Sequence, residues 1–224
     1  MRNEIMLTAT EARVIGSLIE KEITTPDQYP LSMNALKLAC NQKSSRDPIM
    51  SLGDEEVRET LDALSRKHLV LERSGFGSRV PKFKQRFCNT EFSSLQFSEH
   101  ERGIICALLL RGAQTPGQLR THTHRLCEFS DADQVEETLT QLMERPDGPF
   151  VAKLPREAGK RECRFMHLFG DTEEALPESE DPEPVIRRSE LPDRNPLQDL
   201  ERRVTALEQQ MAALQARIPG PDGD

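Results

Sequence analysis

Basic residues alternate with phenylalanines in the segment 82–87. Lys82, Lys84 and Arg86 fall two positions apart, and Phe83 and Phe87 occupy positions between and after them. Because successive side chains of a β-strand point to opposite faces, a strand here places the cations on one face and the phenylalanines on the other. A row of cations along a strand is suited to contacts with a phosphate backbone. The alternative is an ordinary solvated strand face.

Further basic residues extend these predicted contacts into neighbouring loops. Two of them lie in a segment rich in Asn, Gln and Ser, one precedes the basic strand, and two lie in a second basic segment that glutamates dilute. The complete predicted nucleic-acid-binding set is Lys43, Arg46, Arg79, Lys82, Lys84, Arg86, Lys160 and Arg161. The expected partner is double-stranded DNA.

Acidic residues crowd the start of a predicted helix at about 54–67. Asp54, Glu55 and Glu59 lie there, and the equivalent helix at 131–144 is acidic too. Acids at a helix start interact favourably with the helix dipole, but they would repel phosphates where the recognition helix of a helix-turn-helix meets DNA. Two hypotheses therefore stay open. Either DNA contacts the basic segments, or the three acids form a protein-binding surface, by analogy with accessory subunits of chromosome-condensing complexes.

Common catalytic and phosphate-binding motifs are missing from the chain. It contains neither G-x-S-x-G nor H-E-x-x-H, and the G-F-G segment at 75–77 lacks the third glycine and the lysine of a phosphate loop. His122, His124 and Cys127 come nearest to a metal site, but histidines two apart point to different faces of a helix and a fourth ligand is missing. We therefore expect no enzymatic activity, no metal and no cofactor.

Two pairs of similar segments indicate an internal duplication. Residues 10–26 (TEARVIGSLIEKEITTP) resemble 100–116 (HERGIICALLLRGAQTP), and 55–64 (EEVRETLDAL) resemble 133–142 (DQVEETLTQL). The offset falls from 90 to 78 residues between the two pairs, so the first copy carries about 12 extra residues, which include 41–52. A duplicated unit of this length predicts two copies of one small fold.

Each copy predicts three helices followed by a β-hairpin. The first helix begins after Thr8 or Thr10 in one copy and after Ser98 in the other, where Glu101 completes a capping-box spacing. The second helices are predicted at 31–40 and 116–126, and a turn containing glycine joins two extended segments at the end of each copy. This order is the winged helix-turn-helix plan. The predicted fold class is α+β, mostly α, with winged-helix domains at 1–90 and 91–170.

Several long motifs also resemble a known family. The segments LTATEARVIGSLIEKEITTPDQYPLSMNAL, ACNQKSSRDPIM, SGFGSRVPKFKQRFCN, LLLRGAQTPGQLR and GKRECRFMHLF occur in order within residues 7–169, and together they resemble the YceH-like family of bacterial proteins. The resemblance implies a tandem winged-helix fold in a cytoplasmic bacterial protein. It implies no activity and assigns no functional residues.

The C-terminal segment differs in composition from the rest of the chain. Residues 171–224 hold 6 basic and 14 acidic residues, which accounts for the whole net charge of −8. Residues 171–196, rich in acids and prolines, predict a disordered linker, and residues 197–219 predict a coiled-coil helix. Its heptad seam comprises Leu197, Leu200, Val204, Leu207, Met211, Leu214 and Ile218. Such a seam favours a parallel dimer; the alternative is a helix that docks on its own chain or on a partner.

Composition sets the remaining expectations. Hydrophobic residues make up 36% of the 224 residues, which suits two small cores rather than one large one. No apolar run approaches the roughly 20 residues that a membrane-spanning helix needs, and the N-terminus lacks the apolar stretch of a signal peptide. The five cysteines are dispersed and odd in number, as expected for reduced core residues in the cytoplasm.

Overall fold

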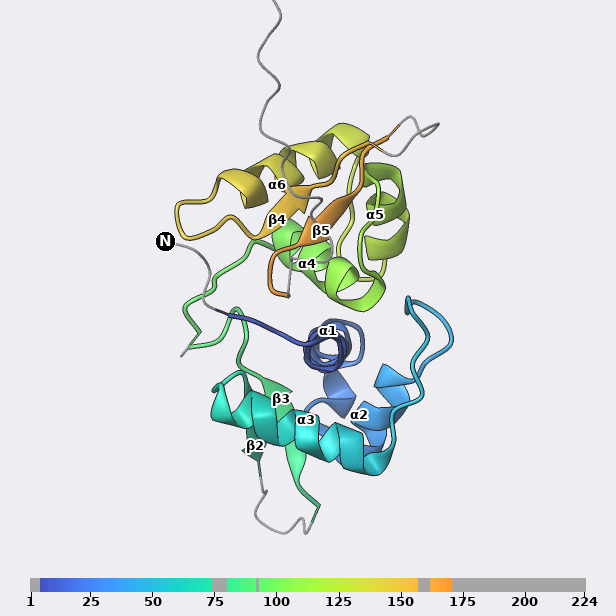
Figure 1. Ribbon diagram of the computed structural model, residues 1–224, viewed down its shortest axis with the longest axis vertical. Helices are drawn as coiled ribbons and strands as arrows, with labels where there is room; N and C mark the ends of the chain where they lie inside the picture. The colour runs from blue at the N-terminus through green and yellow to red at the C-terminus, as the bar shows by residue number, and fades with distance from the viewer. Residues whose placement is uncertain (1–4, 74–79, 92, 157–161, 171–224) are drawn as a thin grey trace, which may run out of the picture. The chain divides into compact units, whose positions relative to one another are not determined.

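The fold is known from a computed structural model that describes residues 5–73, 80–91, 93–156 and 162–170. All of these residues belong to one compact unit, which spans Met1–Glu178. Within them the chain forms six α-helices and two small antiparallel sheets, so the fold is mixed α and β (Figure 1). The predicted linker at 171–196 and the predicted coiled-coil helix at 197–219 lie outside the described residues.

The first half, residues 5–91, contains three helices and a three-stranded sheet. Its elements are α1 (Ala9–Thr24), the short 3-10 helix η1 (Pro26–Gln28), β1 (Leu31–Ser32), α2 (Met33–Cys40), α3 (Asp54–Arg66), β2 (Val70–Arg73) and β3 (Lys82–Gln85). The strand order is β1-β3-β2, with Leu31 opposite Phe83 and Val70 opposite Gln85. The three helices and the hairpin are confirmed, and β1 is an addition that the sequence patterns did not predict.

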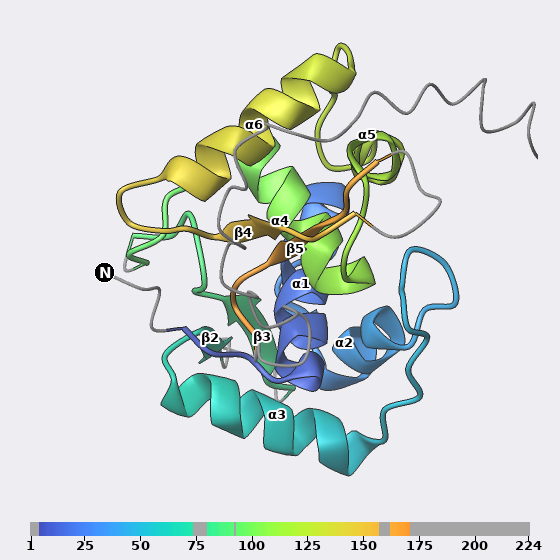
Figure 2. The same ribbon diagram turned by 45° about the horizontal axis from the view of Figure 1, so that its top comes forward.

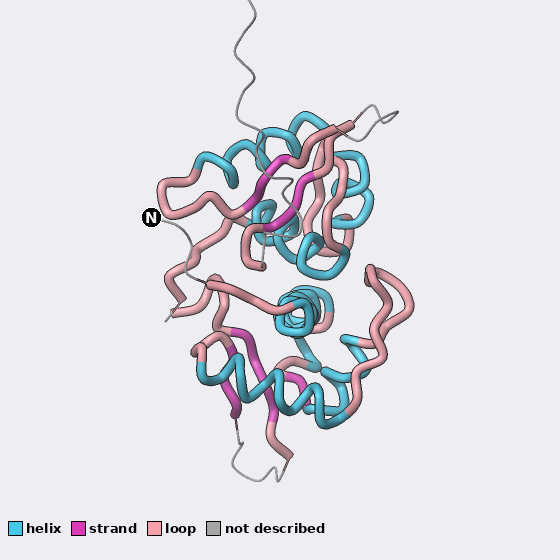
Figure 3. Tube along the Cα trace, in the orientation of Figure 1, coloured by secondary structure: helices cyan, strands magenta, loops and turns pink. Residues whose placement is uncertain are grey.

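The second half, residues 93–170, repeats this order with shorter strands. Its elements are α4 (Glu99–Arg111), α5 (Pro116–Thr123), α6 (Ala132–Glu144), β4 (Val151–Lys153) and β5 (Phe165–His167). Gln114 bridges Phe165 through two backbone hydrogen bonds of 2.8 and 3.0 Å, in the place that β1 occupies in the first half. Figure 3 shows the strands in two separate groups, one in each half.

Capping residues set where the helices begin. The Thr8 hydroxyl accepts the Glu11 backbone N–H at 3.2 Å, and the Glu11 carboxylate accepts the Thr8 N–H at 2.8 Å. Ser98 and Glu101 form the same reciprocal pair at the start of α4. These bonds satisfy backbone donors that a helix start otherwise leaves unpaired. The predicted capping box at Ser98 is confirmed, and Thr8 rather than Thr10 caps α1.

Helices α1 and α4 pack against each other and join the two halves. Both lie at the centre of the unit in Figures 1 and 2. The two helices meet at Gly16, where the Cys106 thiol donates to the Gly16 carbonyl oxygen at 3.4 Å and the Leu110 side chain occupies the space that a Cβ would need. The buried apolar residues of both halves form a single cluster. The expectation of two separate small cores is therefore wrong, because the helices that open each repeat bury their apolar residues against one another.

Residues 41–52, the inserted loop, form the connection between α2 and α3. The Asn41 side chain closes the loop, since its amide donates to the Leu52 carbonyl at 2.9 Å and its oxygen accepts the Leu52 N–H at 2.8 Å. Farther along, the Asp47 N–H donates to the Leu110 carbonyl at the end of α4 at 3.0 Å. The extra residues of the first copy thus reach the second half and contact it.

The cysteines are buried or half-buried free thiols, as expected from the sequence analysis. Cys40, Cys88, Cys106 and Cys127 are buried and Cys163 is half-buried, each as a free thiol. Burial raises the pKa of Cys127 to about 11 and that of Cys88 to about 12, so these thiols are protonated at neutral pH. Among the described residues, no helix is both long and apolar enough to cross a membrane.

Candidate nucleic-acid interface

The outer face of the β2–β3 hairpin carries the basic strand found in the sequence. Arg73 pairs with Lys82 and Leu71 with Lys84, so these four side chains share one face of the hairpin. Arg86 follows on the same side, and its N–H donates to the Leu69 carbonyl at 2.7 Å. We call this surface the ribbon face; its residues are Leu71, Arg73, Lys82, Lys84 and Arg86. A hollow of about 160 Å³ lies on it and is also lined by Thr90 and Glu91.

The inner face of β3 anchors the hairpin to the helices. Phe83 and Phe87 are buried, as the alternation predicted. Gln85, between them, donates to the Glu22 carboxylate of α1 at 2.9 Å and to the Cys88 carbonyl at 3.0 Å. The Gln85 N–H also donates to the Tyr29 hydroxyl oxygen at 2.7 Å. These contacts fix the backbone of β3, so the Cα atoms from which the cations of the ribbon face project have defined spacings.

The second hairpin presents a smaller described basic surface. Lys153 is exposed and its ammonium lies 5.9 Å from the centre of the Phe165 ring. Lys160 and Arg161, like Arg79 of the first hairpin, lie outside the described residues. Strands β2–β3 and β4–β5 lie in different halves and run toward different sides in both views (Figures 1 and 2). The described parts of the two hairpins therefore do not form one continuous face.

Of the two predicted cations in the inserted loop, only Lys43 is exposed. Arg46 is 5% exposed and donates two hydrogen bonds to the Glu20 carboxylate of α1, at 3.1 and 2.7 Å. It also donates twice to the Ala39 carbonyl, at 3.0 and 2.8 Å. A buried guanidinium with these partners cannot reach a phosphate backbone. The prediction that Arg46 contacts nucleic acid is therefore wrong. Arg46 instead holds the inserted loop against α1.

Glu20 is a buried carboxylate that is held in its charged form. Burial by itself raises the pKa of Glu20, but the hydrogen bonds and charge of Arg46, helped by Lys21 at 3.2 Å, outweigh burial and leave the pKa below its ordinary value. Glu20 therefore stays ionised, and its charge is matched by cations within the fold. This ion pair was missed in the sequence analysis. Residues 20 and 46 are far apart in the chain, and no local sequence pattern connects them.

The acids of α3 have different roles. Asp54 pairs with Lys37 of α2 at 2.6 Å, and Glu56 accepts the Gly53 N–H at 2.7 Å, which caps the helix. Glu55 and Glu59 are exposed on the outer face of α3. Part of the acidic character of this helix thus serves its own start and its contact with α2. The predicted self-association residues Leu200, Val204, Leu207, Met211 and Leu214 lie outside the described residues.

Comparison with protein families identifies the relatives of this chain. Residues 7–160 match the family described as "Protein of unknown function, DUF480". The chain belongs to this family. The YceH-like resemblance seen in the sequence is confirmed, because the two names denote the same family.

Individual members of the DUF480 family match most of the chain. The UPF0502 protein of Enterobacter sp. (strain 638) is 54% identical over 213 residues, which cover 95% of this chain and 94% of the relative. The UPF0502 protein of Shewanella sp. (strain ANA-3) is 55% identical over 216 residues, 95% of each chain. That of Vibrio campbellii is 60% identical over 166 residues, 74% of this chain and 76% of the relative. The names of these relatives state no activity.

Proposed function

We propose that this chain is a DNA-binding protein with two winged-helix domains, which contacts the phosphate backbone of double-stranded DNA through the ribbon face. The order of helix, strand, two helices and hairpin, with β1 beside β3, supports the winged-helix part of the proposal. The proposed role is binding rather than catalysis, and it requires no metal or cofactor.

The observation that carries this proposal is the arrangement of cations on the ribbon face. Lys82 and Lys84 lie on one strand, Arg73 lies opposite Lys82, and the buried face of β3 fixes all of them. Phosphate contacts of this kind position a protein on DNA and give it affinity without reading the sequence. Because Asp54 and Glu56 occupy the start of α3, the hairpin is better suited than this helix to approach the backbone.

The proposal is tested by the salt dependence of binding to a DNA duplex. Each phosphate contact contributes about −0.9 to the slope of log affinity against log salt concentration. The double variant K82A/K84A is therefore expected to bind more weakly and to lose roughly 1.8 from that slope. Fluorescence anisotropy with a labelled duplex between 50 and 200 mM salt measures both quantities.

Arg58→Ala is the matched control because Arg58 is an exposed cation on α3. It is expected to leave both affinity and slope unchanged. If R58A weakens binding more than K82A/K84A does, the duplex contacts α3 and the ribbon-face assignment is wrong. Absence of duplex binding by the wild-type chain at 50 mM salt would remove the DNA proposal altogether.

A second candidate function is protein binding through α3. Its support is the exposed position of Glu55 and Glu59 on a helix whose opposite face, with Val57, Leu61 and Leu64, is buried. Charge reversal in E55K/E59K is expected to release a co-purifying protein partner while leaving the fold intact. A wild-type chain that purifies from its native cells without a stoichiometric partner would contradict this candidate.

A further inference from the structure

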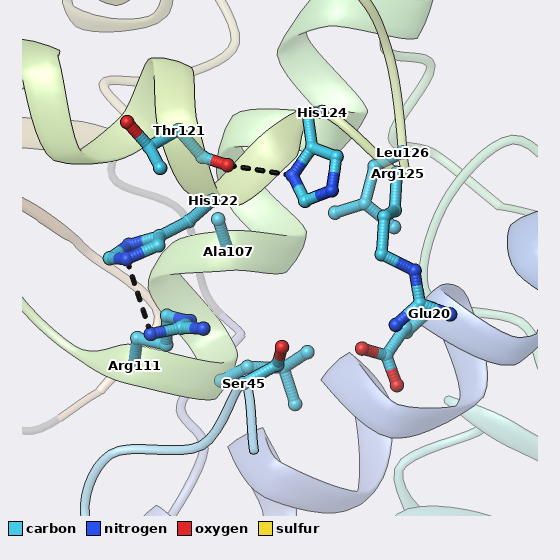
Figure 4. A pocket seen from close by; sticks show the side chains of 10 residues that line it. Glu20, Ser45, Ala107, Arg111, Thr121, His122, His124, Arg125 and Leu126 are labelled. Atoms are coloured by element: carbon cyan, nitrogen blue, oxygen red, sulfur yellow. Dashed lines mark hydrogen bonds between the residues drawn. The ribbon is translucent and has the colours of Figure 1, made fainter.

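A small cavity lies between the two halves of the unit, and we call it the inter-half cavity. Its walls are α1 and the inserted loop on one side and α4, α5 and the turn after α5 on the other (Figure 4). Its volume is about 140 Å³, well below the roughly 300 Å³ at which pockets for drug-sized ligands begin. Thr121, His124 and Arg125 are exposed, so the cavity opens to solvent beside them. Its size suits an ion rather than a nucleotide.

The charges around the inter-half cavity are predominantly positive. Arg111 and Arg125 line it from different sides, and Figure 4 shows Arg111 across the cavity from His124 and Arg125. The lining contains one carboxylate among the described residues, that of Glu20, and Arg46 and Lys21 already balance its charge. An anion entering this cavity would meet two guanidinium groups without facing an unbalanced acid.

Arg111 is held in place by a chain of hydrogen bonds. Its guanidinium donates to Nε2 of His122 at 3.3 Å, and Nδ1 of His122 bonds to the side-chain oxygen of Gln114. The Gln114 amide in turn donates to the Ala107 carbonyl at 3.2 Å. Because an arginine can only donate, Nε2 of His122 accepts and its proton lies on Nδ1. His122 is therefore a neutral positioning residue, and both ring nitrogens are occupied.

The electrostatics of Arg111 favour a bound anion. Burial lowers the pKa of Arg111 most and the charge of Arg46 lowers it further, while the charges of Asp47 and Glu20 act in the opposite direction without reversing the shift. Burial and the Arg111 charge likewise lower the pKa of His122. The described salt bridges give Arg111 no carboxylate partner, although a partly buried cation is stabilised by a paired anion. Four of its five N–H groups remain for such a partner, because His122 accepts one.

His124 and Ser45 complete the opening of the cavity. Nδ1 of His124 donates to the Thr121 carbonyl oxygen at 2.7 Å, so Nε2 is the ring nitrogen left for contact with an occupant of the cavity. Ser45 lies in the inserted loop with φ of 59°, the left-handed region that non-glycine residues rarely adopt. The bonds of Arg46 to Ala39 and Glu20 hold the loop in this conformation. Strained backbone of this kind often accompanies a binding site.

We propose that the inter-half cavity binds a small tetrahedral oxyanion, such as inorganic phosphate, between Arg111 and Arg125. The occupant is a free ion rather than a phosphate of DNA, because α5 and the inserted loop, which both line the cavity, lie on the opposite side of α1 from the hairpin β2–β3 (Figures 1 and 2). Arg111 belongs to the second half and Glu20, Ser45 and the inserted loop to the first, so the bound ion bridges the halves. The site is independent of the proposed ribbon-face contact with DNA.

Titration of the full chain with inorganic phosphate, followed by calorimetry and by thermal unfolding, tests this proposal. We expect a saturable single-site isotherm and a melting temperature that rises with phosphate concentration. Chloride at matched ionic strength is expected to produce neither. Arg111→Gln and Arg125→Gln should each weaken phosphate binding roughly tenfold or more, whereas Arg120→Gln, an exposed arginine outside the cavity, should leave it unchanged.

NMR of the His124 imidazole is a second measurement, which tests the proposal even if Arg111→Gln does not fold. Arg125 is exposed, so Arg125→Gln should leave the core intact. Phosphate should shift the imidazole ¹⁵N resonances of His124 in the wild type but much less in Arg125→Gln. Three results would overturn the proposal: no saturable phosphate binding, equal loss in Arg120→Gln and Arg125→Gln, or chloride effects equal to those of phosphate. Binding of a DNA duplex at this cavity without competition by free phosphate would also overturn it.

Discussion

Arg13 and Arg46 are buried arginines whose charges are balanced in different ways. Arg46 faces a carboxylate, whereas Arg13 donates to three backbone carbonyls, those of Cys40, Pro48 and Leu110, at 3.1, 2.6 and 3.4 Å. Two of these carbonyls belong to the first half and one to the second. Arg13 therefore ties α1, the inserted loop and the end of α4 together. A buried charge is tolerated only with such partners, because desolvation alone would be costly.

Replacement of Arg46 by methionine is expected to destabilise the chain by about 3–5 kcal/mol, because Glu20 would remain as a buried charge without its main partner. Lys43→Met, in the same loop but exposed, should change the free energy of unfolding by about 0.5 kcal/mol or less. Urea denaturation of the three proteins at neutral pH measures these differences. A loss below about 1 kcal/mol in Arg46→Met would show that the pair with Glu20 contributes no more than a surface ion pair.

His167 is expected to make stability depend on pH below neutrality. Burial lowers the pKa of His167 from 6.5 to about 4, while the unfolded chain titrates near 6.5. Between these values the unfolded state holds the extra proton, so the free energy of unfolding falls as pH falls, by up to about 1.4 kcal/mol per unit. His167→Gln keeps an acceptor for the Phe169 N–H and should flatten this dependence. Urea titrations at pH 7, 6 and 5 compare the slopes; equal slopes would contradict the assignment.

Single residues also mark the limit of what the sequence could predict about the site. Lys82 and Lys84 were assigned correctly to the face of β3 opposite Phe83, where Lys82 is exposed and Lys84 half-buried, because alternation with Phe83 is a local signal. Arg46 was misassigned because its partner Glu20 lies 26 positions away. The sequence around a loop arginine is the same whether its side chain faces solvent or a buried carboxylate. The inter-half cavity was missed for the same reason, since its residues come together only through packing of the halves.

At the scale of elements, the contact between α1 and α4 depends on a glycine. A Cβ at position 16 would lie 2.9 Å from both Cγ and Cδ2 of Leu110 and 3.1 Å from Cβ of Leu109. Distances this short leave no room for a methyl group, and Leu110 is itself 3% exposed in the packed interface. The two helices therefore approach as closely as they do because position 16 has no side chain.

Gly16→Ala is expected to lower stability by about 1–3 kcal/mol because the added methyl overpacks the contact between the helices. Gly117→Ala is the matched comparison: it also lies in a helix, and the nearest atom outside its immediate chain neighbours would be 3.8 Å from the new Cβ. That change should be neutral or stabilising, since alanine favours helix. Melting temperatures of both variants test the difference, and a rise in both would show that α1 and α4 can separate without cost.

Elements with local signals were predicted well, and those that depend on distant partners were not. The capping residues, the helical periodicity and the turns leave marks within a few residues, and the duplication repeats these marks in the second half, so the six helices and both hairpins were anticipated. Strand β1 has only two residues and exists because Leu31 meets Phe83, so no periodicity could reveal it. The closure of the inserted loop by Asn41 and Leu52 is likewise a contact between its two ends, which an offset between repeats cannot show.

At the scale of the whole molecule, the described halves act as one body with two different surfaces. The inserted loop, Arg13 and the contact of Leu7 with Phe169, whose backbone atoms bond at 2.6 Å, all cross from one half to the other. The winged-helix boundaries at 1–90 and 91–170 stay predictions.

Because these contacts join the halves, DNA on the ribbon face and an anion in the inter-half cavity would bind to the same folded unit. Each ligand should therefore protect both halves from unfolding.

Self-association through the C-terminal heptads is the prediction that concerns the assembled molecule. Leu200, Leu207 and Leu214 fall seven apart, with Val204 and Met211 between them, and apolar residues at these positions favour a parallel two-stranded coil. Removal of 197–224 is expected to halve the mass measured by light scattering and to leave the melting of the described unit unchanged. Leu207→Glu should have the same effect on mass, because a charge at the seam is desolvated in the dimer.

Gln209→Glu provides the control for this last prediction, since position 209 lies on the outer face of the predicted coil. It adds the same charge two residues away from Leu207 but outside the seam, so the mass of this variant should stay that of the wild type. A wild-type chain that is already monomeric at micromolar concentration would contradict the dimer. If the mass stays constant but removal of 197–224 lowers the melting temperature of the remainder, the helix docks on its own chain instead of pairing with a second copy.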